Sequence, residues 1–357
     1  MAIARERDST EQRAAGRLRP KPNPGALPGC LHWSRDPATG STMSDSHGIV
    51  TIDTGYQRTA FCAAYLVVEA GRAAFIDSGT SRSVPQLLAA LDAHGVPREA
   101  VDWVVLTHVH LDHAGGAGGL MRELPNATLV VHPRGAPHMI DPERLSASAR
   151  AVYGDEEFEH SYGALLPVPA ARVVAADDGH VVELAGRPLA CVHTPGHALH
   201  HLSVWDARAR SWFSGDVFGI SYRELDTARG AFVIPTSSPV QFDPDAMKAS
   251  VHRMLAEAPA RVYLTHFGGV ADCQRLGTDL IAQVDAMVAL ARPLAQAPDR
   301  HARLVAGLEA LYVERARRHG VKDAAQVIPA LLGMDIELNA QGLAVWLDRG
   351  FAKATAG

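Results

Sequence analysis

The chain has 357 residues, a formal net charge of −5 and 20% charged residues, the composition of an ordinary globular protein with room for a large core and about two domains. The mildly acidic total gives no general attraction to nucleic acid, and no apolar run approaches the roughly 18 residues of a membrane span. Four widely spaced cysteines without a Cys-x-x-Cys pair argue against a disulfide framework and a thiolate metal site, so Cys62 and Cys191 are predicted to be small core residues.

Residues 1–45 are rich in Arg, Pro, Ser and Gly and show no sustained apolar period, so we expect a disordered or loosely attached arm outside the core. Met43 lies just before the first predicted strand and is an alternative start of the protein. The segment has no apolar stretch typical of a secretory signal, and an Arg-rich transit peptide is a further alternative. We expect a cytoplasmic protein.

Three apolar segments at 49–53, 61–68 and 72–76, separated by glycine turns, predict a meander of strands. Asp77 follows the third strand and is a candidate N-cap for the next segment. The helical spacing of the leucines within 84–94 predicts an amphipathic helix that covers the sheet.

A strand predicted at 101–107 runs directly into His108, His110, Asp112 and His113. His108 and His110 are two residues apart, so in an extended segment both imidazoles project to the same side and can share one ion. Asp112 and His113 follow after a turn and suit a second ion beside the first. Imidazole and carboxylate ligands without a thiolate favour Zn, Fe or Mn over a structural cysteine-type zinc site.

Three more metal-ligating side chains follow apolar runs further along the chain, namely His197, Asp216 and His266. Layered folds place functional groups on the loops at one edge of their sheets, so we expect these residues to join the first cluster. A histidine-rich surface loop is the alternative for the first cluster, but it does not explain polar residues at three more strand ends.

The glycines between 115 and 119 allow close backbone approach, and a helix is predicted after them up to about Glu123. Residues 134–165 are the least regular part, where a helical decoration with core aromatics is one interpretation. Asp177–Gly179 predicts a hairpin turn. His132 and His193 are predicted to be structural, and one of His200 and His201 is predicted to hydrogen-bond within its loop. The remaining strands are expected at 127–131, 189–194, 202–205, 211–214 and 261–265, and the remaining helices at 247–256, 274–292 and 300–319, with smaller helices up to 357.

The ordered motifs His-x-His-x-Asp-His, Gly-His, Gly-Asp and a final His resemble those of the metallo-β-lactamase fold superfamily over about residues 48–268. The resemblance implies an α+β fold, a four-layer αββα sandwich, with an added C-terminal helical region. It divides the chain into a catalytic domain at 46–270 and a helical region at 271–357, which roofs the active site or forms a dimer contact.

The same resemblance implies the ligand sets: His108, His110 and His197 for the first metal, Asp112, His113 and His266 for the second, and Asp216 as a bridge. It offers Asp77 a second role, as a carboxylate that orients a metal-bound imidazole or its loop. It also makes residues 134–165 a candidate substrate lid. True class B β-lactamases usually carry Cys where Asp216 stands, so the resemblance is to the glyoxalase II, lactonase and thioesterase branch.

Two cations about 3.5–4 Å apart lower the pKa of a bridging water towards about 7, so hydroxide is available at neutral pH. Asp112 is placed to take up its proton, and Tyr222 is a candidate donor to the developing oxyanion, with plain packing as the alternative. We therefore predict a dinuclear hydrolase of a small ester, thioester or lactone, with two divalent metal ions: zinc first, iron or manganese as alternatives. The expected partner is a small-molecule substrate, without nucleic acid or membrane, and a homodimer is left open. The rival functions are an iron-dependent oxidoreductase or dioxygenase and a catalytically weak regulatory binding protein.

Overall fold

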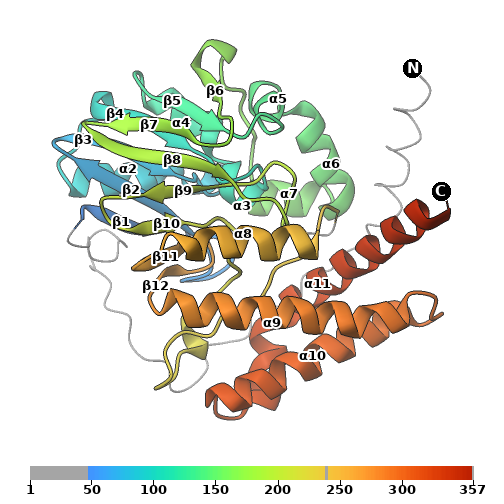
Figure 1. Ribbon diagram of the computed structural model, residues 1–357. Helices are drawn as coiled ribbons and strands as arrows, with labels where there is room; N and C mark the ends of the chain where they lie inside the picture. The colour runs from blue at the N-terminus through green and yellow to red at the C-terminus, as the bar shows by residue number, and fades with distance from the viewer. Residues whose placement is uncertain (1–46, 238–239, 356–357) are drawn as a thin grey trace.

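The computed structural model describes residues 47–237 and 240–355 (Figure 1). The arm predicted at 1–45, with the alternative start at Met43, lies outside the described residues. Across the described ranges, no helix combines the length and apolar character that a membrane crossing requires.

The first sheet contains six strands in the order of the sequence. They are β1 (Ile49–Asp53), β2 (Ala63–Glu69), β3 (Arg72–Ile76), β4 (Val101–Val105), β5 (Thr128–Val131) and β6 (Val173–Ala175). The first three form the predicted antiparallel meander, whereas β3 to β6 pair in parallel. Parallel neighbours need crossover connections, which here run through α2 (Val84–Ala93), α4 (Ala117–Glu123) and the helices between β5 and β6.

The second sheet also contains six strands, in the order β12-β11-β10-β9-β8-β7. They are β7 (His180–Leu184), β8 (Arg187–His193), β9 (Leu202–Asp206), β10 (Ser211–Phe213), β11 (Arg261–Leu264) and β12 (Gly268–Val270). All pairs are antiparallel except β10 with β11, which are joined by the crossover helix α8 (Pro244–Ala256).

Three hydrophobic cores separate four layers. Tyr65 and Val105 from the first sheet pack with Phe213 from the second, so the sheets face each other across one core. Leu87 of α2 belongs to a second core on the outer face of the first sheet, and Met247 of α8 belongs to a third on the outer face of the second sheet. This arrangement confirms the predicted αββα sandwich.

The C-terminal residues form three long helices, α9 (Cys273–Ala291), α10 (Arg300–His319) and α11 (Ala324–Thr355) (Figure 1). They share their core with α8 and the second sheet. The smaller helices predicted after residue 319 are wrong, because α11 is a single helix of 32 residues. Its buried apolar side chains recur every three or four residues across Pro329, so packing sustains the helix past this proline: Ile328, Leu332, Ile336, Ala340, Leu343 and Leu347.

Two local predictions also need correction. Asp177–Gly179 is not a hairpin turn, because β6 before it pairs with β5 and β7 after it pairs with β8, so the turn joins the two sheets. Helix α4 begins at Ala117, before Gly119. Gly118 therefore lies inside the helix, and this position requires glycine because a Cβ there would collide with the Leu166 carbonyl oxygen.

The irregular region at 134–165 is helical, with α5 (Ala136–Ile140), α6 (Glu143–Tyr153) and α7 (Asp155–Ser161). Its aromatic residues Phe158 and Tyr162 form a small core with Leu111 of α3 (Leu111–Ala114), the short helix of the His-x-His-x-Asp-His motif. The helical interpretation is confirmed, and the lid role stays a prediction.

Candidate metal centre

The proposed ligands of the first metal come from two loops at strand ends. His108 and His110 follow β4, and His197 follows β8. Nε2 of His108 lies 2.9 Å from Nδ1 of His110, and Nε2 of His197 lies 3.1 Å from the same Nδ1. The extended backbone between His108 and His110 thus brings both rings to one side, as the spacing predicted.

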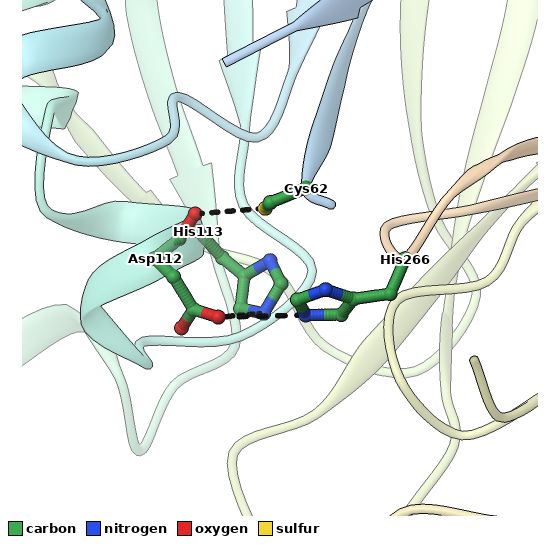
Figure 2. A group of neighbouring side chains, drawn as sticks. All are labelled: Cys62, Asp112, His113 and His266. Carbon is green, nitrogen blue, oxygen red and sulfur yellow. Dashed lines mark hydrogen bonds and ion pairs between the residues drawn. The ribbon is translucent and has the colours of Figure 1, made fainter. Parts of the chain in front are cut away.

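The proposed ligands of the second metal meet beside this group. Asp112 and His113 lie in α3, and His266 follows β11. Oδ2 of Asp112 lies 3.4 Å from Nε2 of His113 and 3.4 Å from Nε2 of His266 (Figure 2). The three side chains converge although residue 266 is far from α3 in the sequence.

The Asp216 carboxylate lies between the two groups. Its Oδ2 is 3.5 Å from Nε2 of His197, and its Oδ1 is 3.6 Å from Nε2 of His113 and 3.9 Å from Nε2 of His266. Thr265 donates a hydrogen bond of 2.6 Å to Oδ1. The carboxylate is therefore within reach of both groups, which is the position of a bridging ligand.

Hydrogen bonds leave the inward-facing nitrogens of two histidines unprotonated in their neutral forms. Nδ1 of His197 donates to the Thr236 carbonyl oxygen at 3.1 Å, and Nδ1 of His266 donates to the Phe61 carbonyl oxygen at 2.8 Å. Each Nε2 then carries a lone pair that faces the centre. Histidine ligands typically have this outward hydrogen bond to a carbonyl or carboxylate.

Unsatisfied nitrogens test whether these residues fit a metal. Among the described residues, both ring nitrogens of His113 are buried without a hydrogen-bond partner, which is costly unless something else binds them. The groups His108, His110 and His197, and His108, His113 and Asp216, each offer one ligand atom per residue within 4.8 Å of one another. Their nitrogen and oxygen donors suit a divalent cation such as Zn²⁺. The residues fit the predicted metals.

Burial and charge set the protonation states of the metal-free centre. Burial lowers the pKa of His108 and of His110 well below the usual range, and the neighbouring histidines add to this effect. Burial alone would raise the pKa of Asp216, but the charges of His113, His266 and His197 outweigh it and lower that pKa. Neutral imidazoles and ionised carboxylates are the forms that bind metals.

Asp77 is fully buried and holds the strand end that carries the ligands. Its Oδ1 accepts a hydrogen bond from the Thr107 backbone N–H at 2.8 Å and from the Thr107 hydroxyl at 3.0 Å, and its Oδ2 lies 3.8 Å from Nδ1 of His113. The N-cap interpretation is wrong, because Thr80 caps the next helical turn. The geometry supports the orienting role instead.

The other histidines near the centre serve the scaffold. Nε2 of His201 accepts from the Asp216 backbone N–H at 3.1 Å, and its Nδ1 lies 2.9 Å from the Thr194 hydroxyl, which confirms the predicted hydrogen bond within the loop. His193 contacts the Ala176 carbonyl oxygen, and Nδ1 of His132 accepts from the Arg134 N–H, so both are structural as predicted.

Tyr222 is fully buried, and its hydroxyl donates to Oδ1 of Asp335 on α11 at 3.2 Å. Its ring stacks on Phe61 with centroids 5.4 Å apart, and Phe61 packs edge-on against His266. The aromatic contact places Tyr222 one ring away from the second group. Its role as an oxyanion donor stays a prediction.

Cys62 lies at the centre, where sequence reasoning predicted only a core residue. It is buried, and its Sγ lies in a group with ligand atoms of Asp112, His113 and His266, all within 4.8 Å of one another (Figure 2). The thiol donates to the Asp112 carbonyl oxygen at 3.3 Å, and burial raises its pKa well above the usual range. No spacing links residue 62 to the motif. Its place follows from the hydrogen bond between the Ala63 N–H and the Thr265 carbonyl oxygen, which joins the start of β2 to the end of β11.

Several curated proteins are similar to this chain. A metallo-beta-lactamase fold-containing protein of Sulfurisphaera tokodaii is 29% identical over 200 residues, which cover 55% of this chain and 69% of that protein. An acyl-coenzyme A thioesterase of Gallus gallus is 30% identical over 43% of this chain and 56% of its own length. A hydroxyacylglutathione hydrolase of Aeromonas hydrophila is 28% identical over 36% of this chain and 37% of its own length. The matched part of this chain thus covers only about half of the thioesterase and about a third of the hydroxyacylglutathione hydrolase.

Solved structures and a family model agree with the observed fold. The crystal structure of an archaeal metallo-beta-lactamase superfamily protein from Sulfolobus tokodaii superposes with a TM-score of 0.54 and 26% identity, over 67% of this chain and 86% of that one. A metallo-beta-lactamase family protein from Thermus thermophilus superposes with a TM-score of 0.56 at 19% identity over 86% of this chain and 94% of that one, a likeness of fold alone. The model of the metallo-beta-lactamase superfamily matches residues 58–266, more than half of the chain. With its sandwich fold and its clustered histidines and aspartates, the chain belongs to the metallo-beta-lactamase superfamily.

Proposed function

We propose that this protein hydrolyses a small ester, thioester or lactone at a dinuclear metal centre. The observation that carries the proposal is the Asp216 carboxylate between two groups of ligand atoms, 3.5 Å from His197 on one side and 3.6 Å from His113 on the other. Relatives named as a hydroxyacylglutathione hydrolase and an acyl-coenzyme A thioesterase support a thioester as the first substrate class to test.

Each proposed ligand is assigned to one of the two cations or to both. His108, His110 and His197 would hold one cation, Asp112, His113 and His266 the other, and Asp216 would contact both. Bound divalent cations lower the pKa of a coordinated water and polarise the carbonyl of a substrate. Zinc is the first candidate for this donor set, with iron or manganese as alternatives.

Asp112 is the carboxylate that we assign to proton transfer. Its side chain is 22% exposed, against 7% for Asp216, so it is the carboxylate of the centre that a substrate reaches more readily. Burial alone would raise its pKa, but the charge of His113 and the hydrogen bond with His266 lower it below the usual range. In this ionised form, Asp112 would accept the proton of a water bound at the centre.

Metal analysis beside a substrate panel tests the proposal. We expect two equivalents of zinc and turnover of thioesters or lactones, with much slower turnover of phosphodiesters. Asp216→Ala should lower the activity at least about 100-fold, which is the usual effect of losing an electrostatic contact to the transition state. The control is Asp245→Ala, at a side chain on α8 that is 90% exposed, and it should leave the activity unchanged.

Other outcomes identify the rival functions. Stoichiometric iron with oxygen consumption and no hydrolysis would replace the hydrolase with an oxidoreductase. Tight binding of a thioester without turnover by the metal-loaded protein would indicate a regulatory binding protein. Full activity of Asp216→Ala would contradict the ligand assignment itself.

A further inference from the structure

The C-terminal helix α11 contacts the segment that orients His197. The ring of His197 is held by its Nδ1–H, which donates to the Thr236 carbonyl oxygen at 3.1 Å. That hydrogen bond keeps the proton on Nδ1 and leaves the lone pair of Nε2 facing His110. The position of one backbone carbonyl therefore sets both the tautomer and the direction of this ligand.

Asn339 of α11 binds the residues on both sides of that carbonyl. Its Oδ1 accepts from the Ser237 backbone N–H at 2.6 Å, and its Nδ2 donates to the Pro235 carbonyl oxygen at 2.9 Å. The Ser237 hydroxyl also donates to the Asn339 carbonyl oxygen at 3.0 Å. Thr236 is thus fixed by hydrogen bonds to the residue before it and the residue after it.

The Asn339 amide is itself buried and fully engaged. The residue is 2% exposed, and its Nδ2 also donates to the Tyr312 hydroxyl of α10 at 3.0 Å. A buried amide is stable only when both its donors and its oxygen have partners, so its orientation is determined by these contacts. The side chain joins two C-terminal helices to the loop behind His197.

The same face of α11 also stands behind the second group. Asp335 lies four residues before Asn339, about one helical turn, and accepts from the Tyr222 hydroxyl at 3.2 Å. The Tyr222 ring stacks on Phe61, whose carbonyl oxygen accepts from Nδ1 of His266 at 2.8 Å. One helix face therefore supports the hydrogen-bond acceptors of two proposed ligands, one from each group.

We infer that α11 is part of the metal centre, with Asn339 as a positioning residue that holds His197 through the 235–237 segment. The inference rests on the proposed function, because it requires a metal at His197. It assigns the C-terminal helices a role in metal binding, beyond the roof or dimer contact that the sequence suggested. Loss of a group that hydrogen-bonds directly to a metal ligand typically weakens metal binding about 10–100-fold, and Asn339 acts one residue beyond such a group, so we expect a loss at the lower end of this range.

Three variants separate positioning from general stability. Asn339→Ala removes the three hydrogen bonds of the amide to the 235–237 segment. Leu343→Ala, one turn further along α11 at a fully buried site, destabilises the same helix by a cavity and is the matched control. Asn339→Asp keeps an acceptor for the Ser237 N–H but places a buried carboxylate oxygen against the Pro235 carbonyl oxygen, so it should weaken metal binding at least as much as Asn339→Ala.

The readouts are metal affinity, by competition with a chelator, and the visible spectrum of the cobalt-substituted protein. In Asn339→Ala we expect one of the two ions to bind about tenfold more weakly and the cobalt spectrum to change. Leu343→Ala should keep the affinities and the spectrum of the wild type while it lowers the melting temperature.

The inference is overturned if Asn339→Ala loses stability as Leu343→Ala does but keeps both affinities and the spectrum. If Asn339→Ala does not yield folded protein, Asn339→Asp decides by the same criterion. A wild-type protein that binds no metal would instead overturn the proposed function and this inference with it. The two failures therefore appear in different samples.

Discussion

The metal-free protein should become less stable as the pH rises from about 7 to about 9, because of His266. Burial by itself would lower the pKa of this imidazole. The charges of Asp216 and Asp112 and the hydrogen bond with Asp112 outweigh burial and raise the pKa to about 9. The folded chain therefore binds a proton at His266 more tightly than the unfolded chain, in which the pKa is about 6.5.

The size of the effect follows from this difference. A shift of about 2.5 units at about 1.4 kcal/mol per unit corresponds to about 3 kcal/mol in the free energy of unfolding. The contribution is fully present below pH about 6.5 and is lost as the pH rises through about 9. His266 is 6% exposed, so screening by solvent is small.

Most of the other shifted groups act outside this window. The pKa values of Asp77 and Asp335 are raised to about 6, chiefly by burial, so their stabilising contributions are lost before the pH reaches about 7. The lowered pKa values of His108 and His110 favour the folded state as the pH rises, but that gain is nearly complete above pH about 6.5. Burial also raises the pKa values of Cys62, Cys191 and Cys273, and their thiols in the unfolded chain ionise at about pH 8.5, so they add to the fall in stability towards pH 9. Between pH 7 and 8, His266 should therefore dominate.

Urea unfolding in the presence of a chelator, followed by tryptophan fluorescence at several pH values between about 6.5 and 9, measures the effect. His266→Gln is the control, because it removes the titrating group, and its stability should change little between pH 7 and 8, below the range in which the thiols ionise. A wild-type stability that stays level or rises between pH 7 and 8 would refute the reasoning. So would an equal fall in His266→Gln.

Three further predictions follow from the same structure. The affinity for one of the two metal ions should rise about tenfold per pH unit up to pH about 9, because His266 must release its proton to bind; isothermal titration at several pH values measures this slope, and an affinity independent of pH would contradict it. Asp77→Ala should weaken metal binding about 10–100-fold, because Thr107 loses the carboxylate that holds it beside the ligands. Competition with a chelator measures the affinity, and an affinity equal to that of the wild type would contradict the prediction. Gly118→Ala should lower the free energy of unfolding by about 1–3 kcal/mol, since its Cβ collides with the Leu166 carbonyl oxygen. Thermal unfolding measures the loss, and the control is Gly333→Ala, where a Cβ meets nothing within 4 Å.

The amino-acid pattern was enough to predict many of the elements and the candidate ligands, whereas the layers and the division of the ligands between two metals came from the resemblance of the ordered motifs to a known family. Strand and helix periodicities are local, so β1, β3 and α10 lie at the predicted bounds. His108, Asp216 and His266 each follow an apolar strand, and strands of one sandwich end at a shared edge. Several polar residues after strands therefore indicate a shared site, although His132, which directly follows β5, does not belong to it.

Only the tertiary structure decided which distant residues support those ligands. Cys62 reaches the centre because β2 begins beside the end of β11, and strand pairing depends on partners far apart in the sequence. Asn339 is a single amide within a long helix, and its sequence neighbours do not indicate that it binds the loop behind His197. Asp177–Gly179 has the composition of a hairpin turn, yet it joins two sheets because β6 and β7 find different partners. Local composition determines the elements, but their long-range pairing decides which side chains surround the metal centre.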